Sequence, residues 1–330
     1  MKNILNYLYS HKSLSHEEAK MVLTNIAQGQ YNHSQIASFL SVYLMRSITV
    51  EELSGFRDAL LELRIPIEIK GFDTIDMCGT GGDGKNTFNI STLSSFVVAG
   101  AGYKVTKHGN YGVSSGCGSS NIMETLGYKF SNEQGKLLNE LEKAGICYLH
   151  APLFNPAMKN VAPVRKDLGV RTFFNMLGPM INPTLPKYQV VGVYSLELAR
   201  IYSYIYQNTD KNYIILYSLD GYDEISLTSS FKLISRNFEQ ILTPEDIGME
   251  YCVAEDLKSG SSVEESVKLF LDILQGNGNK AQNNIVVANS ALGIKCFNPD
   301  FSMSDCVEIA KDSLMKGKAY NVLKKLLELQ

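Results

Sequence analysis

Apolar side chains in the first 65 residues recur every three or four positions, as in helices that bury one face. Leu53, Phe56 and Leu60 give the clearest of these patterns. Three such patterns begin with a polar residue that has Glu or Gln three positions later, which is the sequence form of a capping box. We therefore predict three short helices that pack as a small bundle and end before Pro66. The predicted capping boxes are Ser15-x-x-Glu18, Asn32-x-x-Gln35 and Thr49-x-x-Glu52.

From residue 74 the pattern changes to short apolar runs that alternate with helical periods. Such alternation is typical of an α/β domain with a mostly parallel central sheet. We therefore predict a small all-helical domain over residues 1–70 and a larger α/β domain over residues 71–330. Residues 155–187 are rich in Pro and Asn, and we expect part of this segment to join the helical domain. The predicted strands are 74–77, 103–106, 189–193 and 213–217, and the predicted helices include 93–101, 196–207 and 263–274.

The composition is that of an ordinary globular protein with no overall attraction for polyanions. Charged residues make up 20% of the 330 residues, and the formal net charge is −3. This balance argues against a nucleic-acid or membrane partner, and it requires any anion site to be local. The six cysteines form no C-x-x-C pair, which argues against a zinc site or a disulfide framework. Free thiols and the lack of a long apolar run in the sequence predict a cytoplasmic protein.

A glycine-rich stretch over residues 78–92, CGTGGDGKNTFNIST, joins the first predicted strand to a helix. Glycines let the backbone approach a ligand, and the start of a helix offers free N–H groups to an anion. The stretch matches both a dinucleotide fingerprint and most of a Walker A motif. A dinucleotide site needs an acidic residue about 20 positions later, yet residues 84–123 contain no Asp or Glu. A Walker A site needs a hydroxyl where Asn86 stands, so neither motif accounts for the loop.

A second loop follows the next predicted strand, where Lys107 and His108 lead into Gly109 and Asn110. Ligands of open α/β sheets bind at this end of the strands. The run VSSGCGSS, residues 113–120, then offers hydroxyls and unobstructed backbone amides. Two amide-rich loops at two strand ends suit a ligand with two separate phosphate groups, such as a phosphorylated sugar that carries a pyrophosphate.

Six motifs spread over nearly the whole chain occur in a characteristic order: CGTGGDG, NIST, KHGN, VSS, FNPAMKNVAPVRKDLGVRTFFNMLGP and GYDEIS. In these motifs the chain resembles the anthranilate phosphoribosyltransferase family of tryptophan biosynthesis. The resemblance implies a helical domain and an α/β domain, a homodimer built through the helical domains, and Mg²⁺ as the cofactor. It also implies transfer of the phosphoribosyl group of phosphoribosyl pyrophosphate (PRPP) to the amine of anthranilate, with release of pyrophosphate.

The resemblance further implies which residues line the PRPP site. They belong to the two loops and to the helix start between them. They are Gly79, Gly82, Asp83, Thr87, Asn89, Ile90, Ser91, Thr92, Lys107, Ser115 and Ser119.

Asn110 and Arg165 would hold anthranilate according to the same resemblance. A guanidinium matches a carboxylate in a two-pronged fork, as this role requires. Arg171 has the same chemistry, and only the family motif favours Arg165. Lys107 and His108 are the candidate catalytic residues. His108 would either accept a proton or stack beside the substrate ring, and a structural hydrogen bond is the alternative.

Ser91, Asp223 and Glu224 would bind magnesium, which takes carboxylates and substrate phosphates as ligands. The two acidic residues lie in a glycine turn after a predicted strand, where neighbouring carboxylates can converge or can serve different ions. An adjacent Asp-Glu pair is more often a solvated turn, so the family motif carries this assignment. Asp83 either caps its own loop or reaches a ligand hydroxyl.

Four positions depart from the family pattern. Tyr111 stands where Arg is usual, Gly116 where Lys is usual, Asn121 where Asp is usual and Asn155 where His is usual. The first two changes remove cations beside the expected pyrophosphate. The motifs that would bind anthranilate and magnesium are intact.

Two other functions fit parts of the sequence. A pyrimidine nucleoside phosphorylase shares the two-domain plan, although its phosphate loops differ from KHGN and NIST. A non-catalytic paralogue that binds single-stranded nucleic acid would need a basic stripe and a strong salt dependence, and the net charge of −3 argues against it.

Overall fold

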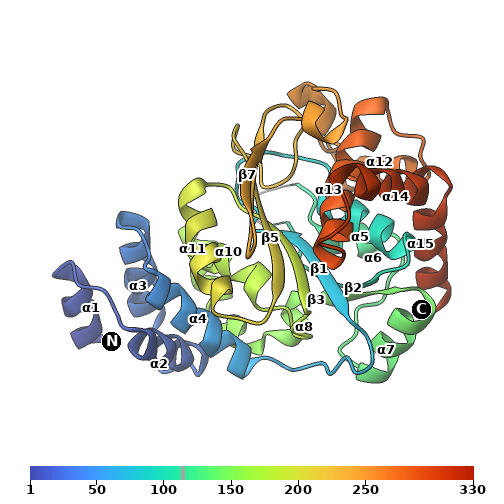
Figure 1. Ribbon diagram of the computed structural model, residues 1–330. Coiled ribbons are helices and arrows are strands. Elements are labelled where there is room, and N and C mark those ends of the chain that lie inside the picture. The colour runs from blue at the N-terminus through green and yellow to red at the C-terminus, as the bar shows by residue number, and fades with distance from the viewer. Residues whose placement is uncertain (113–115) are drawn as a thin grey trace. The chain divides into compact units, whose positions relative to one another are not determined.

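The structure is a computed structural model that describes residues 1–112 and 116–330 (Figure 1). Ser115, one of the predicted substrate-binding residues, lies outside the described residues. The chain divides into two compact units. We call residues 1–67 and 151–185 the helical unit, and residues 68–150 and 186–330 the sheet unit. In the described ranges, no helix combines the length and the hydropathy that a membrane-spanning segment needs.

The helical unit is a bundle of amphipathic helices completed by a later segment of the chain. The three predicted capping boxes all form, and they start helices α2, α3 and α4. Helix α1 was not predicted, because no side chain caps its start, so four helices precede residue 65 and not three. Phe173, from the later segment, packs against Phe39 and Tyr43, and it stacks on Phe56 with ring centroids 4.4 Å apart. The helices of this unit are α1 (Lys2–Tyr9), α2 (His16–Ala27), α3 (His33–Met45), α4 (Val50–Leu63), α8 (Ala151–Phe154), α9 (Ala162–Leu168) and α10 (Phe174–Leu177).

The sheet unit is built around a sheet whose strand order, in the described residues, is β3-β2-β1-β4-β5-β6-β7. Strands β1 to β5 pair in parallel, and β6 and β7 extend the sheet in antiparallel pairing. The mostly parallel sheet confirms the predicted fold class, although β3, β6 and β7 were not among the predicted strands. The strands are β1 (Thr74–Gly79), β2 (Lys104–Gly109), β3 (Ile146–His150), β4 (Tyr188–Gly192), β5 (Asn212–Ser218), β6 (Phe231–Ser235) and β7 (Glu239–Leu242).

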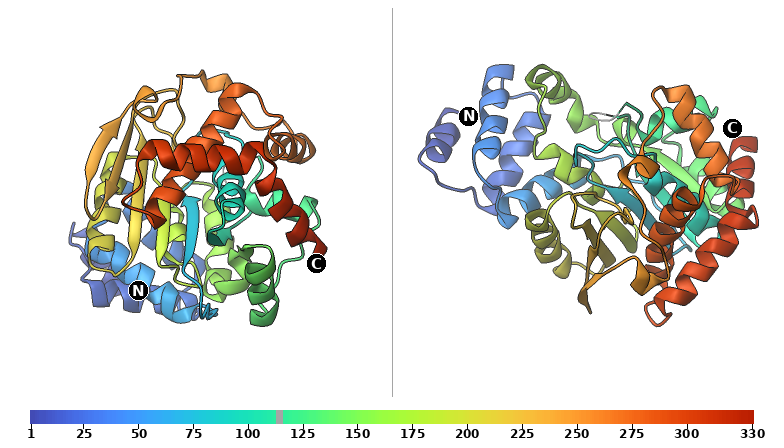
Figure 2. Two further views of the ribbon diagram at one scale, coloured as in Figure 1. Left: turned by 45° about the vertical axis from the view of Figure 1, so that its right-hand side comes forward. Right: turned by 90° about the horizontal axis from the view of Figure 1, so that it is seen from above.

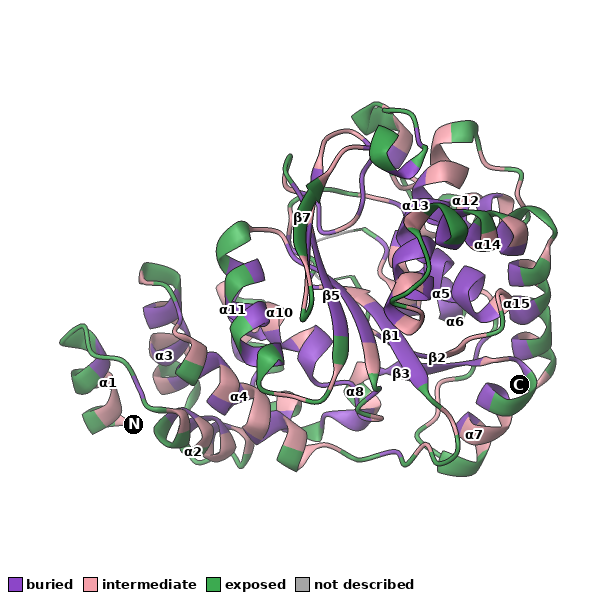
Figure 3. Ribbon diagram, viewed as in Figure 1, coloured by how far each residue is buried: buried purple, intermediate pink, exposed green. Residues whose placement is uncertain are grey.

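Helices cover both faces of this sheet (Figures 1 and 2). On β4, Gln189 accepts a hydrogen bond at 2.9 Å from the hydroxyl of Tyr206 on α11, while Val190 lies in the core shared with α5 and α13. Neighbouring residues of a strand point to opposite faces, so α11 lies on the face opposite α5 and α13. The central strands are buried along most of their length (Figure 3), as expected for a parallel sheet between two helix layers. The helices of this unit are α5 (Ile90–Gly100), α6 (Ser119–Thr125), α7 (Gln134–Lys143), α11 (Leu196–Gln207), α12 (Val263–Leu274), α13 (Lys280–Phe297), α14 (Met303–Met315) and α15 (Lys318–Glu328).

The strand order reverses between β1 and β4. From β1 the chain continues to β2 and β3 on one side, and β4 and β5 lie on the other side. The carboxyl ends of β1 and β4 are therefore neighbours, with Gly79 paired to Gly192. The crevice outside such a reversal is the usual ligand position in an open α/β sheet.

Candidate active site

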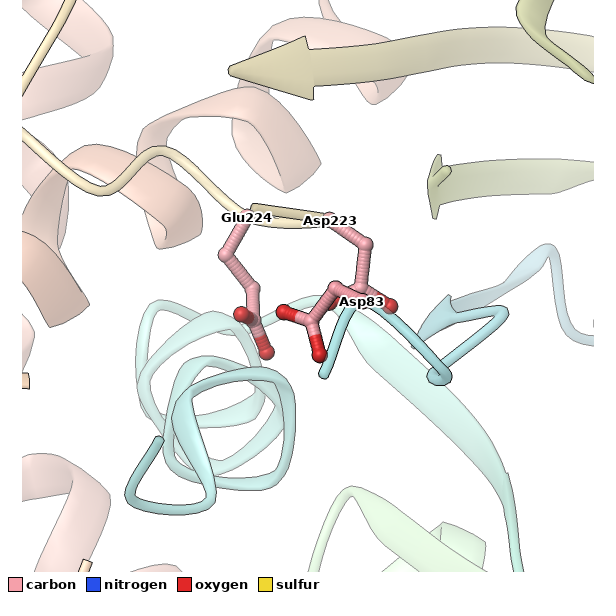
Figure 4. Close-up of side chains that lie close together, drawn as sticks. All are labelled: Asp83, Asp223 and Glu224. Atoms are coloured by element: carbon pink, nitrogen blue, oxygen red, sulfur yellow. The ribbon is translucent and has the colours of Figure 1, made fainter. Parts of the chain in front are cut away.

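Three acidic side chains converge beside the glycine loop (Figure 4). Asp83 comes from the loop and Asp223 and Glu224 from the turn after β5, and each offers a carboxylate oxygen within 4.8 Å of the others. The turn is joined to the loop because Asp223 accepts a hydrogen bond at 2.7 Å from the backbone N–H of Gly81. Asp83 also accepts a hydrogen bond at 3.0 Å from the N–H of Lys85, so it caps its own loop and joins the acidic cluster. The sequence interpretation did not foresee that these two roles combine.

Two glycines make room for this turn at the edge of the sheet. A Cβ atom at position 79 would overlap the carboxylate of Asp223, and one at position 192 would overlap its backbone carbonyl. Because Gly79 and Gly192 end neighbouring strands, the absence of both side chains lets Asp223 reach the switch point. Gly192 was missed by the sequence interpretation, and its only signal is a glycine at the end of a predicted strand. The predicted site residue Gly82 lies in the loop with a φ angle of +78°.

Burial and mutual repulsion raise the pKa values of the acidic cluster, although Lys85 and Lys107 act in the opposite direction. Burial, followed by the nearby Asp223, raises the pKa of Asp83 to about 6. Burial raises the pKa of Asp223, and it raises that of Glu224 well above the usual range, with the two aspartates as further causes. A divalent cation would reverse these shifts by favouring the ionised carboxylates.

Four buried oxygen atoms in and beside the loop have no hydrogen-bond partner among the residues that the structure describes. Folded proteins satisfy most buried polar groups, so a local concentration of unpaired oxygens indicates a missing ligand or ion. Two of these atoms belong to the acidic cluster and two are threonine hydroxyls. They are Thr80 Oγ1, Asp83 Oδ2, Thr92 Oγ1 and Glu224 Oε2.

Lys107 places a buried cationic group beside the first turn of α5. Its side chain points from β2 into the buried interior, with 3% of the residue exposed. The ammonium donates to the backbone carbonyl of Met77 at 2.6 Å and to Ser91 Oγ at 3.5 Å. The predicted catalytic lysine and the predicted metal ligand Ser91 are therefore neighbours.

Other predicted PRPP-site residues flank the start of α5. Thr87 forms an antiparallel bridge with Lys258. Asn89 occupies the N-cap position, but its side chain donates to the carbonyl of Cys117 at 3.2 Å instead of capping the helix. Ile90 is fully buried in the apolar core, so only its backbone could contact a ligand.

His108 and Asn110 lie at the carboxyl end of β2 and just beyond it. The backbone N–H of His108 donates at 3.2 Å to the carboxylate of Asp76, which is fully buried on β1. Asn110 is exposed, and its Oδ1 accepts a hydrogen bond at 2.8 Å from the next backbone N–H. Asp76 thus holds the end of β2 in place. The sequence interpretation missed this residue, because no motif marks it.

The residues that depart from the family pattern make structural contacts of their own. The hydroxyl of Tyr111 donates to Glu124 at 3.1 Å. Asn121 accepts hydrogen bonds from two glycine N–H groups at 3.2 and 2.9 Å. Asn155, in the helical unit, donates to a backbone carbonyl four residues earlier at 3.2 Å. Gly116 lies at an exposed position beside the undescribed residues.

Arg165 belongs to helix α9 of the helical unit. Its Nη2 donates to Asn175 Oδ1 at 3.3 Å, and its guanidinium lies 5.4 Å from the centre of the Phe174 ring. Burial lowers the pKa of Arg165, although a guanidinium stays charged in proteins. In the described ranges it forms no ion pair, so this half-buried cation is available to a carboxylate ligand. Asn175, which also accepts the N–H of Thr172 at 3.2 Å, was missed by the sequence interpretation.

Comparisons of the sequence agree over the whole chain. Residues 71–320 match the α/β domain of the glycosyl transferase family, and residues 2–63 match the helical bundle domain of that family. The anthranilate phosphoribosyltransferase of Flavobacterium psychrophilum is 60% identical over 329 residues, which cover 100% of this chain and 99% of the relative. The enzyme of the same name from Bacteroides fragilis is 51% identical with the same coverage.

Comparisons of the structure agree with those of the sequence. Anthranilate phosphoribosyltransferase from Thermus thermophilus is 30% identical, with a TM-score of 0.91 and 98% of each chain covered. The Saccharomyces cerevisiae enzyme in complex with PRPP and Mg has a TM-score of 0.89 over 98% of this chain and 96% of that one, and at 24% identity it shows the shared fold. This chain therefore belongs to the anthranilate phosphoribosyltransferase family.

Proposed function

We propose that this chain transfers the phosphoribosyl group of PRPP to the amine of anthranilate, releasing pyrophosphate, as an enzyme of tryptophan biosynthesis. The observation that carries the proposal is the acidic cluster of Asp83, Asp223 and Glu224 beside a glycine loop at the switch point of the sheet. Family membership over the full chain supports it. The helical unit and the sheet unit would then be the two domains predicted from the sequence.

We assign magnesium to Asp223 and Glu224, with Ser91 as a further ligand and Asp83 beside them. The unpaired oxygens of Asp83 and Glu224 and the raised pKa values of the three acids fit a bound divalent cation. When bound, Mg²⁺ neutralises charge on the pyrophosphate as it departs. The S. cerevisiae relative was solved in complex with PRPP and Mg, which supports the same cofactor here.

We assign PRPP to the glycine loop, the start of α5 and the end of β2. The backbone N–H groups of this region offer donors to phosphate oxygens, and the buried ammonium of Lys107 supplies a fixed positive charge. The hydroxyl of Thr92, which has no partner in the described part of the chain, is a further donor in this region. The proposed PRPP-binding residues are Gly79, Gly82, Asp83, Thr87, Asn89, Ile90, Ser91, Thr92, Lys107, Ser115 and Ser119.

We assign anthranilate to Asn110 and Arg165, with the guanidinium forming a fork to the substrate carboxylate. In the reaction, the amine nitrogen bonds to C1 of the ribose while the bond from C1 to the pyrophosphate oxygen breaks. One amine proton then leaves, and we propose His108 as its acceptor. The chain's main contribution is to hold the two substrates in line and to stabilise the charge that develops on the leaving group.

The experiment that tests this function follows the fluorescence of anthranilate in the presence of the purified protein. We expect the fluorescence to fall only when PRPP and Mg²⁺ are both present. Fluorescence that stays constant under these conditions would contradict the proposal. Phosphate-dependent release of thymine from thymidine would instead favour a nucleoside phosphorylase, and a gel shift with single-stranded nucleic acid at moderate salt would favour the binding paralogue.

We also propose a homodimer formed through the helical unit. Helices α1, α2 and α3 carry large apolar residues at the surface, including Tyr9, Met21 and Met45, and Met45 is 86% exposed. Light scattering should then give about twice the chain mass of 36.6 kDa, whereas the mass of one chain would exclude the dimer.

A cytoplasmic location is the remaining part of the proposal. All six cysteines are free thiols, a state that persists in a reducing compartment. Cell fractionation with antibody detection would test the location, and recovery from a secreted or envelope fraction would contradict it.

A further inference from the structure

A chain of hydrogen bonds, which we call the relay, runs from a buried histidine to one of the residues assigned to PRPP. His150 Nδ1 lies 2.8 Å from Ser120 Oγ, which lies 3.0 Å from Tyr148 Oη. Tyr148 Oη in turn lies 2.7 Å from Ser119 Oγ. Because Tyr148 and His150 are two residues apart on β3, their side chains point to the same face, and that face meets the first residues of α6.

Packing holds the relay in one arrangement. Tyr148 and Ser120 are buried, and the imidazole of His150 stacks on the ring of Phe130 with centroids 4.3 Å apart. A Cβ atom at position 109 would overlap the hydroxyls of both Tyr148 and Ser119, so the glycine of the KHGN motif gives the relay its space. Because packing fixes the heavy atoms, only the directions in which the hydroxyl hydrogens point can change.

The number of hydrogens decides which way the relay can run. Each of the three hydroxyls donates one hydrogen. If His150 Nδ1 carries no proton, Ser120 donates to it, Tyr148 donates to Ser120 and Ser119 donates to Tyr148, so no hydrogen remains for a ligand. If Nδ1 carries a proton, every bond can run outward from His150, and the hydrogen of Ser119 is then free to point at a phosphate oxygen.

We propose that His150, Ser120 and Tyr148 are positioning residues for PRPP, and that the Nδ1–H form of His150 orients Ser119 to donate to a phosphate. This inference rests on the proposed function, through the assignment of Ser119. In the Nδ1–H form, Nε2 becomes the acceptor nitrogen, and it has no hydrogen-bond partner in the protein among the described residues. Without a ligand, the outward hydrogen of Ser119 has the Asn110 carbonyl at 3.4 Å as its acceptor.

Tyr148→Phe tests the relay, because it removes one hydroxyl and keeps the buried ring. Ser119 then loses its fixed orientation. We expect the KM for PRPP to rise about three- to tenfold, which corresponds to the net contribution of one hydrogen bond to binding. The KM for anthranilate should stay within about twofold of the wild-type value. In a Ser119→Ala background, Tyr148→Phe should add nothing, because the two residues act through one bond.

Tyr128→Phe is the matched control. Tyr128 is also a buried tyrosine, and its ring lies 5.9 Å from that of Tyr148. Its hydroxyl donates to Glu140 at 2.7 Å and lies 3.2 and 3.4 Å from the backbone carbonyl and N–H of Tyr148, so it touches the backbone of that residue and not the hydroxyls of the relay. It should lower the melting temperature and leave both KM values unchanged. A merely structural role for Tyr148 would give the same pattern as this control, and that result would overturn the proposal.

The proton on His150 can be observed directly by NMR of the protein with ¹⁵N-labelled histidine, titrated with PRPP and Mg²⁺ in the absence of anthranilate. We expect Nδ1 of His150 to be the protonated nitrogen once PRPP is bound. An unprotonated Nδ1 in the bound state would overturn the inference and leave the proposed function intact. If the wild-type protein neither binds PRPP nor consumes anthranilate, both this inference and the proposed function are wrong.

Discussion

The double variant Asp223→Asn, Glu224→Gln should lose PRPP-dependent consumption of anthranilate, with kcat at least about a hundred- to a thousandfold below wild type. Amides keep the shape of the side chains but cannot supply the negative charge that a divalent cation requires. Two of the three converging carboxylates disappear, and Asp83 alone remains. Initial rates measured by anthranilate fluorescence over a range of Mg²⁺ concentrations would check this expectation.

The same variant should be at least as stable as wild type when no metal is present. The pKa of Asp83 rises from 3.8 to about 6 on folding, and those of Asp223 and Glu224 rise as well. A raised carboxyl pKa means that the folded state binds more protons than the unfolded state, so these acids weaken folding as the pH rises through this window and above it. Melting temperatures of wild type and variant at pH 8 in EDTA would show whether the amides remove this loss of folding stability.

Two single variants sharpen the test of the metal site. Gly79→Ala places a methyl group against the carboxylate of Asp223 and should raise the Mg²⁺ concentration needed for half-maximal rate. Gly135→Ala, on α7, is its control, because a Cβ atom there meets nothing within 4 Å. Turnover near the wild-type level in the double variant, or equal Mg²⁺ dependence in the two glycine variants, would show that the acidic cluster does not hold the metal.

Local signals account for the elements that were predicted well. Helices α11 and α12 match their predicted bounds, and each begins after a serine that caps it, Ser195 and Ser262. Strand β2 runs to Gly109, beyond its predicted end, because its last residues pair with β3. Strand β3 itself is short and buried, so it shows no alternation of apolar and polar residues from which to predict it.

The candidate site was only partly predictable because its geometry depends on the order of strands. The resemblance named Asp223 and Glu224, but nothing in the sequence places Asp83 within 4.8 Å of them, 140 positions earlier in the chain. That proximity requires β1 and β4 to be neighbours and both to end in glycine. Likewise, the buried Asp76 that holds the His108 amide becomes apparent only when β1 and β2 are paired.

Arg165→Ala should raise the KM for anthranilate about 10- to 100-fold and leave the KM for PRPP within about threefold. The variant removes a charged hydrogen-bond donor, an interaction of roughly 1.5 to 3 kcal/mol. Arg165 is suited to this role because Asn175 holds its Nη2, the Phe174 ring supports the guanidinium, and no carboxylate of the described residues pairs with it. Steady-state kinetics with each substrate varied in turn would give the two constants.

Two further arginine variants decide between this role and a general loss of structure. Arg165→Lys should recover only part of the affinity, because an ammonium keeps the charge but cannot form the fork to a carboxylate. Arg171→Ala changes the other arginine of the same motif and should leave the KM for anthranilate near wild type. If Arg171→Ala has the larger effect, or if Arg165→Ala raises the KM for PRPP more than that for anthranilate, the carboxylate is bound elsewhere and Arg165 has no part in recognising it.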